Sequence, residues 1–127
     1  MHAEDVTERR RAARQLPSLP PESVKRLAVG ALGDPDPDVR VTALEALLDG
    51  RAEGLGRQIV GWLADPDSRV RRAAADALAA EPFSGAVAAL GRVLADPEPA
   101  VRVAAARALG ASGASAAVVP LLGRLDD

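Results

Sequence analysis

The sequence predicts an all-α protein built as a stack of helical repeats. The first observation behind this is a motif, Leu-x-Asp-Pro, that begins at Leu32, Leu63 and Leu94. Each occurrence follows the last by 31 residues, since 63 − 32 and 94 − 63 are both 31. The second observation is that apolar residues recur at steps of three and four, as on one face of a helix. A fixed period of this kind indicates copies that pack on one another.

Each copy has two apolar stripes and therefore two helices. Around the middle Asp-Pro pair the stripes are Leu55, Ile59 and Leu63 before it and Val70, Ala74 and Leu78 after it. The eight expected helices lie near residues 4–16, 21–33, 37–49, 54–64, 68–80, 84–95, 99–111 and 114–125. We expect one domain over residues 1–127, with repeats at approximately 3–33, 34–64, 65–95 and 96–127.

The first expected helix is the least regular, because it keeps only Arg9, Ala12 and Leu16 of the repeated pattern. Its outer side carries a run of charged residues, as the polar end of a stack would. The last expected helix, 114–125, instead spreads apolar residues over a wide arc. Because an uncovered repeat face invites pairing, we expect self-association or partner docking through this C-terminal helix.

Proline and acidic residues set the ends of the other helices. Each motif proline, such as Pro35, disfavours helical geometry in the residue before it, so the preceding helix must stop near the Asp. Asp36, Asp67 and Glu98 then stand where a side-chain oxygen can cap the next helix, although Glu is a poorer cap than Asp. Glycines and Pro82 break the remaining connections, which are expected to be short loops.

Composition narrows the class of protein. Hydrophobic residues make up 48% of the chain but aromatic residues only 2%, so the core must be built from many small side chains. No apolar run approaches the roughly 18 residues that span a bilayer, and a cytoplasmic protein without membrane contact is expected. Cysteine is absent, which excludes disulfides and thiolate chemistry, and a net charge of −2 argues against a general polyanion binder.

The pattern Asp-Pro-x-x-x-Val-Arg-x-x-Ala-x-x-x-Leu, at Asp65–Leu78 and Asp96–Leu109, resembles a HEAT repeat. It is most similar to the short bacterial type known from phycobilisome-lyase proteins. The resemblance covers nearly the whole chain and implies a right-handed α-solenoid. In such a solenoid the Val-Arg helices would line the concave side and the helices before each Asp-Pro the convex side. This motif indicates a fold and not an activity.

Two charged columns follow the same period. They are Asp34, Asp65 and Asp96, together with Arg40, Arg71 and Arg102, which Arg9 extends into the first repeat. The family resemblance implies a structural ladder, in which each carboxylate binds helix-start amides and a neighbouring Arg. Recurrence in every copy favours this structural role, because an active site needs its groups once. A ligand-binding role remains the alternative, since a fixed guanidinium also suits anions.

The sequence predicts no enzymatic activity, metal site or cofactor. The one histidine, His2, lies beside the initiator Met, so neither a metal cluster nor a His-based acid-base pair is available. The serines fall at expected helix starts or loops without a base to activate them, which favours capping roles. The glycines form no phosphate-binding pattern.

Exposed positions on the Val-Arg helices form a candidate partner-binding surface, which we call the concave ridge. Its residues are Arg10, Arg14, Val41, Glu45, Arg72, Asp76, Val103 and Arg107. Arg is enriched at interface hot spots, and Val is unusual on a merely solvated helix. The alternative is that the two valines are exposed by chance. Trp62 also allows two interpretations. It packs between outer helices, or it anchors a partner.

The function predicted from these observations is a non-enzymatic adaptor or scaffold that presents the concave ridge to a protein partner or peptide. The alternative is an accessory subunit of a chromophore lyase or another modifying enzyme, which the family resemblance suggests. Nucleic-acid binding is a third class. It is disfavoured because Glu45 and Asp76 interrupt the ridge arginines, and 18 acidic residues outnumber 16 basic ones.

Overall fold

The computed structural model describes residues 5–48 and 53–112, and these residues form helices and turns without a strand. The α-helices are α1 (Val6–Arg14), α2 (Pro21–Ala31), α3 (Pro37–Glu45), α4 (Gly56–Val60), α5 (Ser68–Ala80), α6 (Val87–Val93) and α7 (Pro99–Ala111). Three short 3-10 helices accompany them, η1 (Leu16–Ser18), η2 (Gly61–Ala64) and η3 (Ser84–Ala86). None of the described helices is long and apolar enough to cross a membrane.

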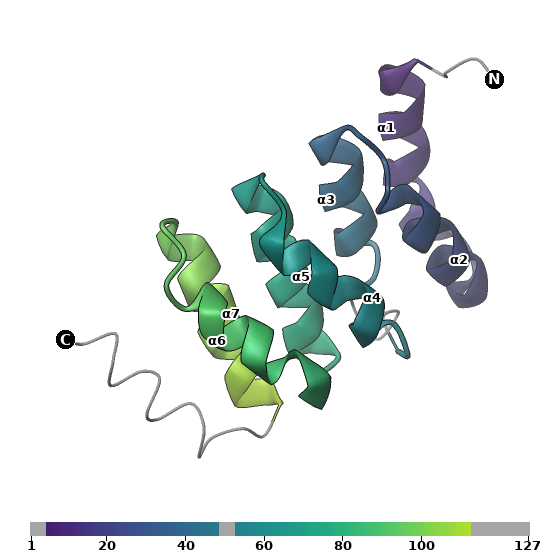
Figure 1. Cartoon of the computed structure of the whole chain (residues 1–127). Helices are drawn as coiled ribbons and strands as arrows, with labels where there is room; N and C mark the ends of the chain where they lie inside the picture. The colour runs from purple at the N-terminus through teal and green to yellow at the C-terminus, as the bar shows by residue number, and fades with distance from the viewer. Residues whose placement is uncertain (1–4, 49–52, 113–127) are drawn as a thin grey trace.

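The helices form two layers that run along one stack (Figure 1). One layer, which we call the inner layer, consists of α1, α3, α5 and α7, and each of them packs on the next. The outer layer consists of α2, α4 and α6. These outer helices lie against the following inner helix, so that α2 packs on α3, α4 with η2 on α5, and α6 on α7. The α1 and α7 helices therefore lie at opposite ends of the described stack (Figure 1).

A single core of small aliphatic side chains runs through the stack. The periodic alanines Ala43, Ala74 and Ala105 are all 0% exposed, and side chains as small as these let neighbouring helices approach closely. The outer helices contribute their own stripe, of which Val24, Ala28 and Leu32 in α2 are typical and fully buried. Burial thus comes from many small groups, as the low aromatic content predicts.

The helix starts agree with the sequence-based expectation. The Asp36 carboxylate accepts a hydrogen bond from the Val39 amide at 3.1 Å and caps α3. Asp67 accepts from the Arg69 amide at 2.8 Å and caps α5 in the same way. Glu98 stands at the cap of α7 without a side-chain bond to it, because its longer side chain fits this role poorly.

The expected number and length of the helices need correction. The described residues hold seven α-helices and not eight, and the expected helix at 114–125 lies outside them. The expected helices 54–64 and 84–95 each divide into an α-helical and a 3-10 part, and 37–49 is helical only to residue 45. Glycines explain the divisions, because Gly61 begins η2 and Gly85 lies inside η3, and glycine disfavours regular helix.

Two glycines make room for the aromatic ring of Phe83, in the loop between α5 and η3. A Cβ atom on Gly56 would lie 2.5 Å from the Phe83 Cγ, and a Cβ on Gly85 would lie 2.5 Å from its Cζ. Real Cβ atoms do not come this close, so both positions require glycine while the ring stays in place. The partly buried ring packs against the core and joins the start of α4 to the loop that follows α5.

We predict that Gly56→Ala destabilises the fold by about 2 kcal/mol, because the added methyl group must displace the Phe83 ring. The matched control is Gly61→Ala, where a Cβ meets nothing within 4 Å. This control should be neutral or slightly stabilising, since alanine is the better helix former. Urea unfolding followed by circular dichroism measures both changes. Equal stabilities for the two variants would contradict the packing role of Gly56.

Candidate interaction surface

The periodic Arg and Asp residues pair across successive repeats. The Arg9 guanidinium donates to Asp34 at 2.9 Å, Arg40 to Asp65 at 2.9 Å and Arg71 to Asp96 at 2.7 Å. Each Arg reaches the carboxylate that follows it by 25 residues, which belongs to the next repeat. The columns singled out in the sequence therefore form a ladder of ion pairs along one edge of the stack.

Every group in a rung has further bonds within the protein. Arg71 also donates to the Asp65 carbonyl at 2.8 Å, and the second oxygen of Asp96 accepts from the Glu98 amide at 2.9 Å. Burial alone would raise the pKa of Asp96, but the hydrogen bond from Arg71 and the Glu98 amide hold it below its usual value. Arg102 donates to the Asp96 carbonyl at 2.7 Å. This geometry ties each turn to the next and leaves little capacity for a ligand.

We predict that Arg71→Ala lowers the free energy of unfolding by about 3 kcal/mol, because it leaves the largely buried Asp96 carboxylate without its cation. The neighbouring Arg72→Ala is the matched control, since the Arg72 side chain is 61% exposed. It should change stability by about 0.5 kcal/mol or less. Thermal and urea unfolding measure both. A stable Arg71→Ala protein that had lost partner binding would instead assign the ladder to a ligand.

The concave ridge occupies two register positions of the inner helices. One position holds Arg10, Val41, Arg72 and Val103, and the other holds Arg14, Glu45, Asp76 and Arg107. All eight residues lie in the described part of α1, α3, α5 and α7. In the N-terminal part of the ridge, Arg10 and Val41 have contacts within the protein. The C-terminal part consists of Arg72, Asp76, Val103 and Arg107.

Arg10 is less available to a partner than the expected ridge requires, because its guanidinium is paired within the protein. Its guanidinium makes two hydrogen bonds to Asp36, at 2.9 and 3.0 Å, and approaches Asp38 at 3.4 Å. The hydrogen bond from Arg10, together with the Val39 amide, lowers the pKa of Asp36 to about 2. Val41 is also less available than expected, since it is half-buried and packs against the core. Arg14 and Glu45 are exposed, as expected.

A second charge network continues from Asp38, and it was not predicted from the sequence. Arg69 on α5 donates to Asp38 at 2.7 Å and to Asp67 at 3.0 Å. The hydrogen bond from Arg69 lowers the pKa of Asp67, and both carboxylates raise the pKa of Arg69. A signal was present, because Asp38 and Arg69 are 31 residues apart and carry opposite charges at one register position.

The C-terminal part of the ridge is open and only weakly paired within the protein. The Arg72 and Arg107 side chains are 61% and 64% exposed, and both approach Asp76, at 3.8 and 3.7 Å. These contacts are too long for good hydrogen bonds. Burial raises the pKa of Asp76, and the two arginines only partly oppose it. Val103 is 57% exposed beside them on the same helix as Arg107.

Shallow hollows adjoin Asp76 on this face. One is lined by Val41, Glu45, Arg69, Arg72, Ala73 and Asp76. The other is lined by Leu48, Asp76, Ala79, Ala80, Arg107 and Ala111. Both hollows thus combine charged side chains with small apolar ones. This composition is typical of a polar protein-binding surface and not of an enclosed small-molecule site.

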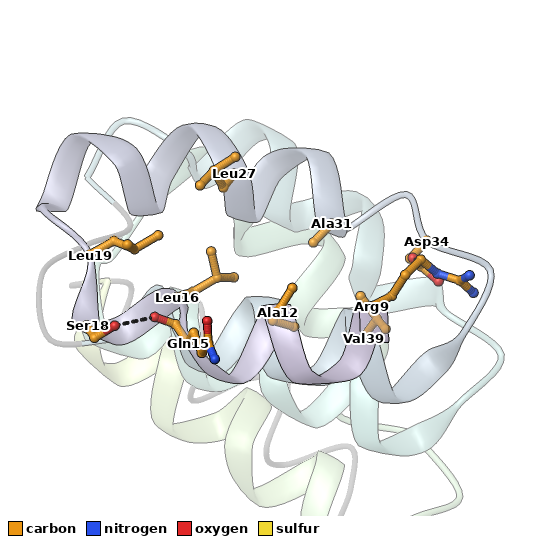
Figure 2. Close-up of a pocket in the computed structure, with 11 residues that line it drawn as sticks. Arg9, Ala12, Gln15, Leu16, Ser18, Leu19, Leu27, Ala31, Asp34 and Val39 are labelled. Atoms are coloured by element: carbon orange, nitrogen blue, oxygen red, sulfur yellow. Dashed lines mark hydrogen bonds and ion pairs between the residues drawn. The ribbon is translucent and has the colours of Figure 1, made fainter. Parts of the chain in front are cut away.

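An apolar groove lies at the other end of the stack, between α1 and α2 (Figure 2). It has a volume of about 410 Å³, and its lining includes Ala12, Leu16, Leu19, Leu27 and Ala31. This finding corrects the expectation of a polar end, because the charged residues of α1 leave one of its faces apolar. The Arg9–Asp34 rung closes one end of the groove (Figure 2).

Trp62 and His2 are the remaining residues that the sequence singled out. Trp62 in η2 is half-buried and packs against the core. Within the described ranges, no group of three or more acidic or His side chains could hold a metal ion. His2 lies outside those ranges. No buried side-chain nitrogen or oxygen of a described residue lacks a hydrogen-bond partner.

We predict a loss of stability between about pH 4 and pH 2. Asp36, Asp67 and Asp96 have folded pKa values below the ordinary 3.8, so their stabilising contribution is full above that value. It falls as the pH drops and the folded carboxylates take up protons. Asp36→Asn should flatten this pH dependence, because Asn keeps the helix cap without the titrating charge. Urea midpoints measured from pH 7 to pH 2 test this, and parallel curves for parent and variant would contradict it.

Comparison with known proteins supports a repeat architecture. A family model described as HEAT repeats matches residues 57–127, which is more than half of the chain. A search of curated proteins finds no significant match.

Proposed function

Since the chain belongs to the HEAT-repeat family, we propose that it is a non-enzymatic adaptor that presents its inner-helix surface to a protein partner or peptide. Repeats of this family commonly mediate protein–protein interactions, and stacked repeats provide extended binding surfaces. We also propose that the stack is a right-handed α-solenoid of the short bacterial phycobilisome-lyase type, with α1, α3, α5 and α7 on its concave side. The motif at Asp65–Leu78 supports this subtype.

The observation that carries the proposal is the open C-terminal part of the ridge. Arg9, Arg40 and Arg71 pair with their carboxylates at 2.7–2.9 Å. In contrast, Arg72 and Arg107 approach their carboxylate only at 3.7–3.8 Å. Their donors are therefore available without breaking a strong internal bond. Val103 adds an exposed apolar side chain on α7, four residues before Arg107. Arg is enriched at interface hot spots, and the apolar neighbour adds surface that a partner can remove from water.

The test is affinity capture from native lysate with the double variant Arg72→Glu/Arg107→Glu. We expect recovery of a specific partner to fall about tenfold or more, because two favourable charges become repulsive. The matched control is Arg26→Glu/Arg57→Glu, which reverses two exposed arginines on the outer helices α2 and α4. Circular dichroism of both variants checks that they are folded.

The outcomes separate the possible surfaces and ligands. A partner lost equally from both double variants would contradict a specific role for the ridge. A ligand that proved to be nucleic acid, with affinity falling steeply as salt rises, would contradict the protein partner. A mixed protein interface should depend on salt more weakly, because only part of it is electrostatic.

A further inference from the structure

Two arginines from different inner helices approach one carboxylate in the C-terminal part of the ridge. Arg72 lies one turn before Asp76 on α5, and its Nε is 3.8 Å from an Asp76 oxygen. Arg107 reaches across from α7, which packs on α5, and its Nη1 is 3.7 Å from the other Asp76 oxygen. Two positive charges therefore share one negative charge, which leaves a surplus of positive charge among these three residues.

Asp76 holds the two arginines loosely. Both distances exceed those of good hydrogen bonds, whereas Arg71 in the ladder bonds Asp96 at 2.7 Å. Burial outweighs the attraction of the two arginines and raises the pKa of Asp76. The Asp76 side chain is 32% exposed, about half as much as those of Arg72 and Arg107. A carboxylate that approaches from solvent therefore meets the two guanidinium groups more readily than it meets Asp76.

Apolar side chains adjoin the two arginines. The hollow beside Arg107 is lined by small apolar groups, namely Leu48, Ala79, Ala80 and Ala111. Val103 lies one turn before Arg107 on the same helix and is 57% exposed. A protein segment with apolar side chains next to acidic ones can use both kinds of surface. Nucleic-acid phosphates match only the arginines, and Glu45 and Asp76 would repel them.

The separation of the two guanidinium groups fits an extended segment. Side chains two residues apart point to the same side of an extended chain and lie about 7 Å from each other. Two guanidinium groups that approach one carboxylate from two helices, at 3.8 and 3.7 Å, have a separation of the same order. We propose that the ridge binds an extended acidic segment of a partner protein. Two carboxylates of this segment, two residues apart, pair with Arg72 and Arg107, and a neighbouring apolar side chain lies in the hollow beside Arg107. This inference rests on the proposed adaptor function and specifies the chemistry of the partner.

The first test is selection from a phage-displayed library of random peptides on the immobilised chain. We expect the selected peptides to be enriched in pairs of Asp or Glu two residues apart, next to a large apolar residue. Selection on Arg72→Glu/Arg107→Glu should instead favour Lys and Arg, because this surface attracts the opposite charge. The matched control Arg26→Glu/Arg57→Glu, on the outer helices, should select the same acidic peptides as the parent. A selection without acidic enrichment, or the same peptides on parent and ridge variant, would overturn the proposal.

The second test asks whether Asp76 competes with the partner's carboxylates. The probe is a fluorescein-labelled peptide from the selection, and its affinity is measured by fluorescence anisotropy. We expect Asp76→Asn to bind it about fivefold more tightly, because this change removes the internal competitor and its repulsion. The matched control Glu22→Gln removes the same charge from an exposed position on α2, and it should change the affinity less than about twofold, because screening weakens distant charges. Weaker binding by Asp76→Asn would contradict an acidic partner, since Asp76 would then attract the ligand.

The outcomes distinguish the acidic segment from the adaptor function. If no acidic peptide is selected while capture from lysate still depends on Arg72 and Arg107, the adaptor function stands and the acidic segment is wrong. If acidic peptides bind the ridge while capture is lost equally from the ridge and control variants, the adaptor function fails and the acidic site stands. Displacement of the labelled peptide by a single-stranded DNA oligonucleotide, at lower concentrations than by the unlabelled peptide, would assign the arginines to phosphates and overturn the proposal.

Discussion

The ion pair from each Arg to the Asp of the next repeat is the contact on which the rest of the structure depends. Alanine-rich helix faces pack without direction, so they alone would allow one repeat to slide along another. Arg40 prevents this because it bonds the Asp34 carbonyl on its own side and the Asp65 carboxylate on the other. The same carboxylate accepts from the Asp67 amide and shapes the turn. One residue pair therefore fixes both the turn and the repeat spacing.

A fixed spacing places equivalent residues of adjacent repeats side by side, which made much of the site predictable. The period would also bring Asp76 beside Arg107 and Asp38 beside Arg69, and the structure pairs both, although neither pair was predicted. The inner helices, their caps and the ladder contacts follow from the sequence for the same reason. These features depend on local backbone chemistry and on a register that the chain repeats, and neither requires knowledge of the exact packing.

The features that the sequence did not reveal depend on contacts outside the period. Arg10 was expected at the ridge, but its register equivalent Val41 carries no charge, so nothing signalled its pairing with Asp36. The ring of Phe83 occurs once, and the glycines that make room for it resemble ordinary helix breakers in the sequence. The apolar groove was not predicted, because α1 is rich in charged residues. The sequence does not show which neighbouring helix covers each face, and the exposure of a face depends on that.

The two open surfaces differ in the forces that a partner would meet. At the ridge, burial raises the pKa of Asp76 although two arginines flank it, so these arginines do not fully compensate its desolvation. Their remaining donors face water, and added salt should weaken a contact made through them. The groove is lined largely by Ala and Leu side chains, whose association strengthens in salts such as sulfate that are excluded from protein surfaces. Binding at the ridge and binding at the groove should therefore respond to salt in opposite ways, because the two surfaces differ in composition.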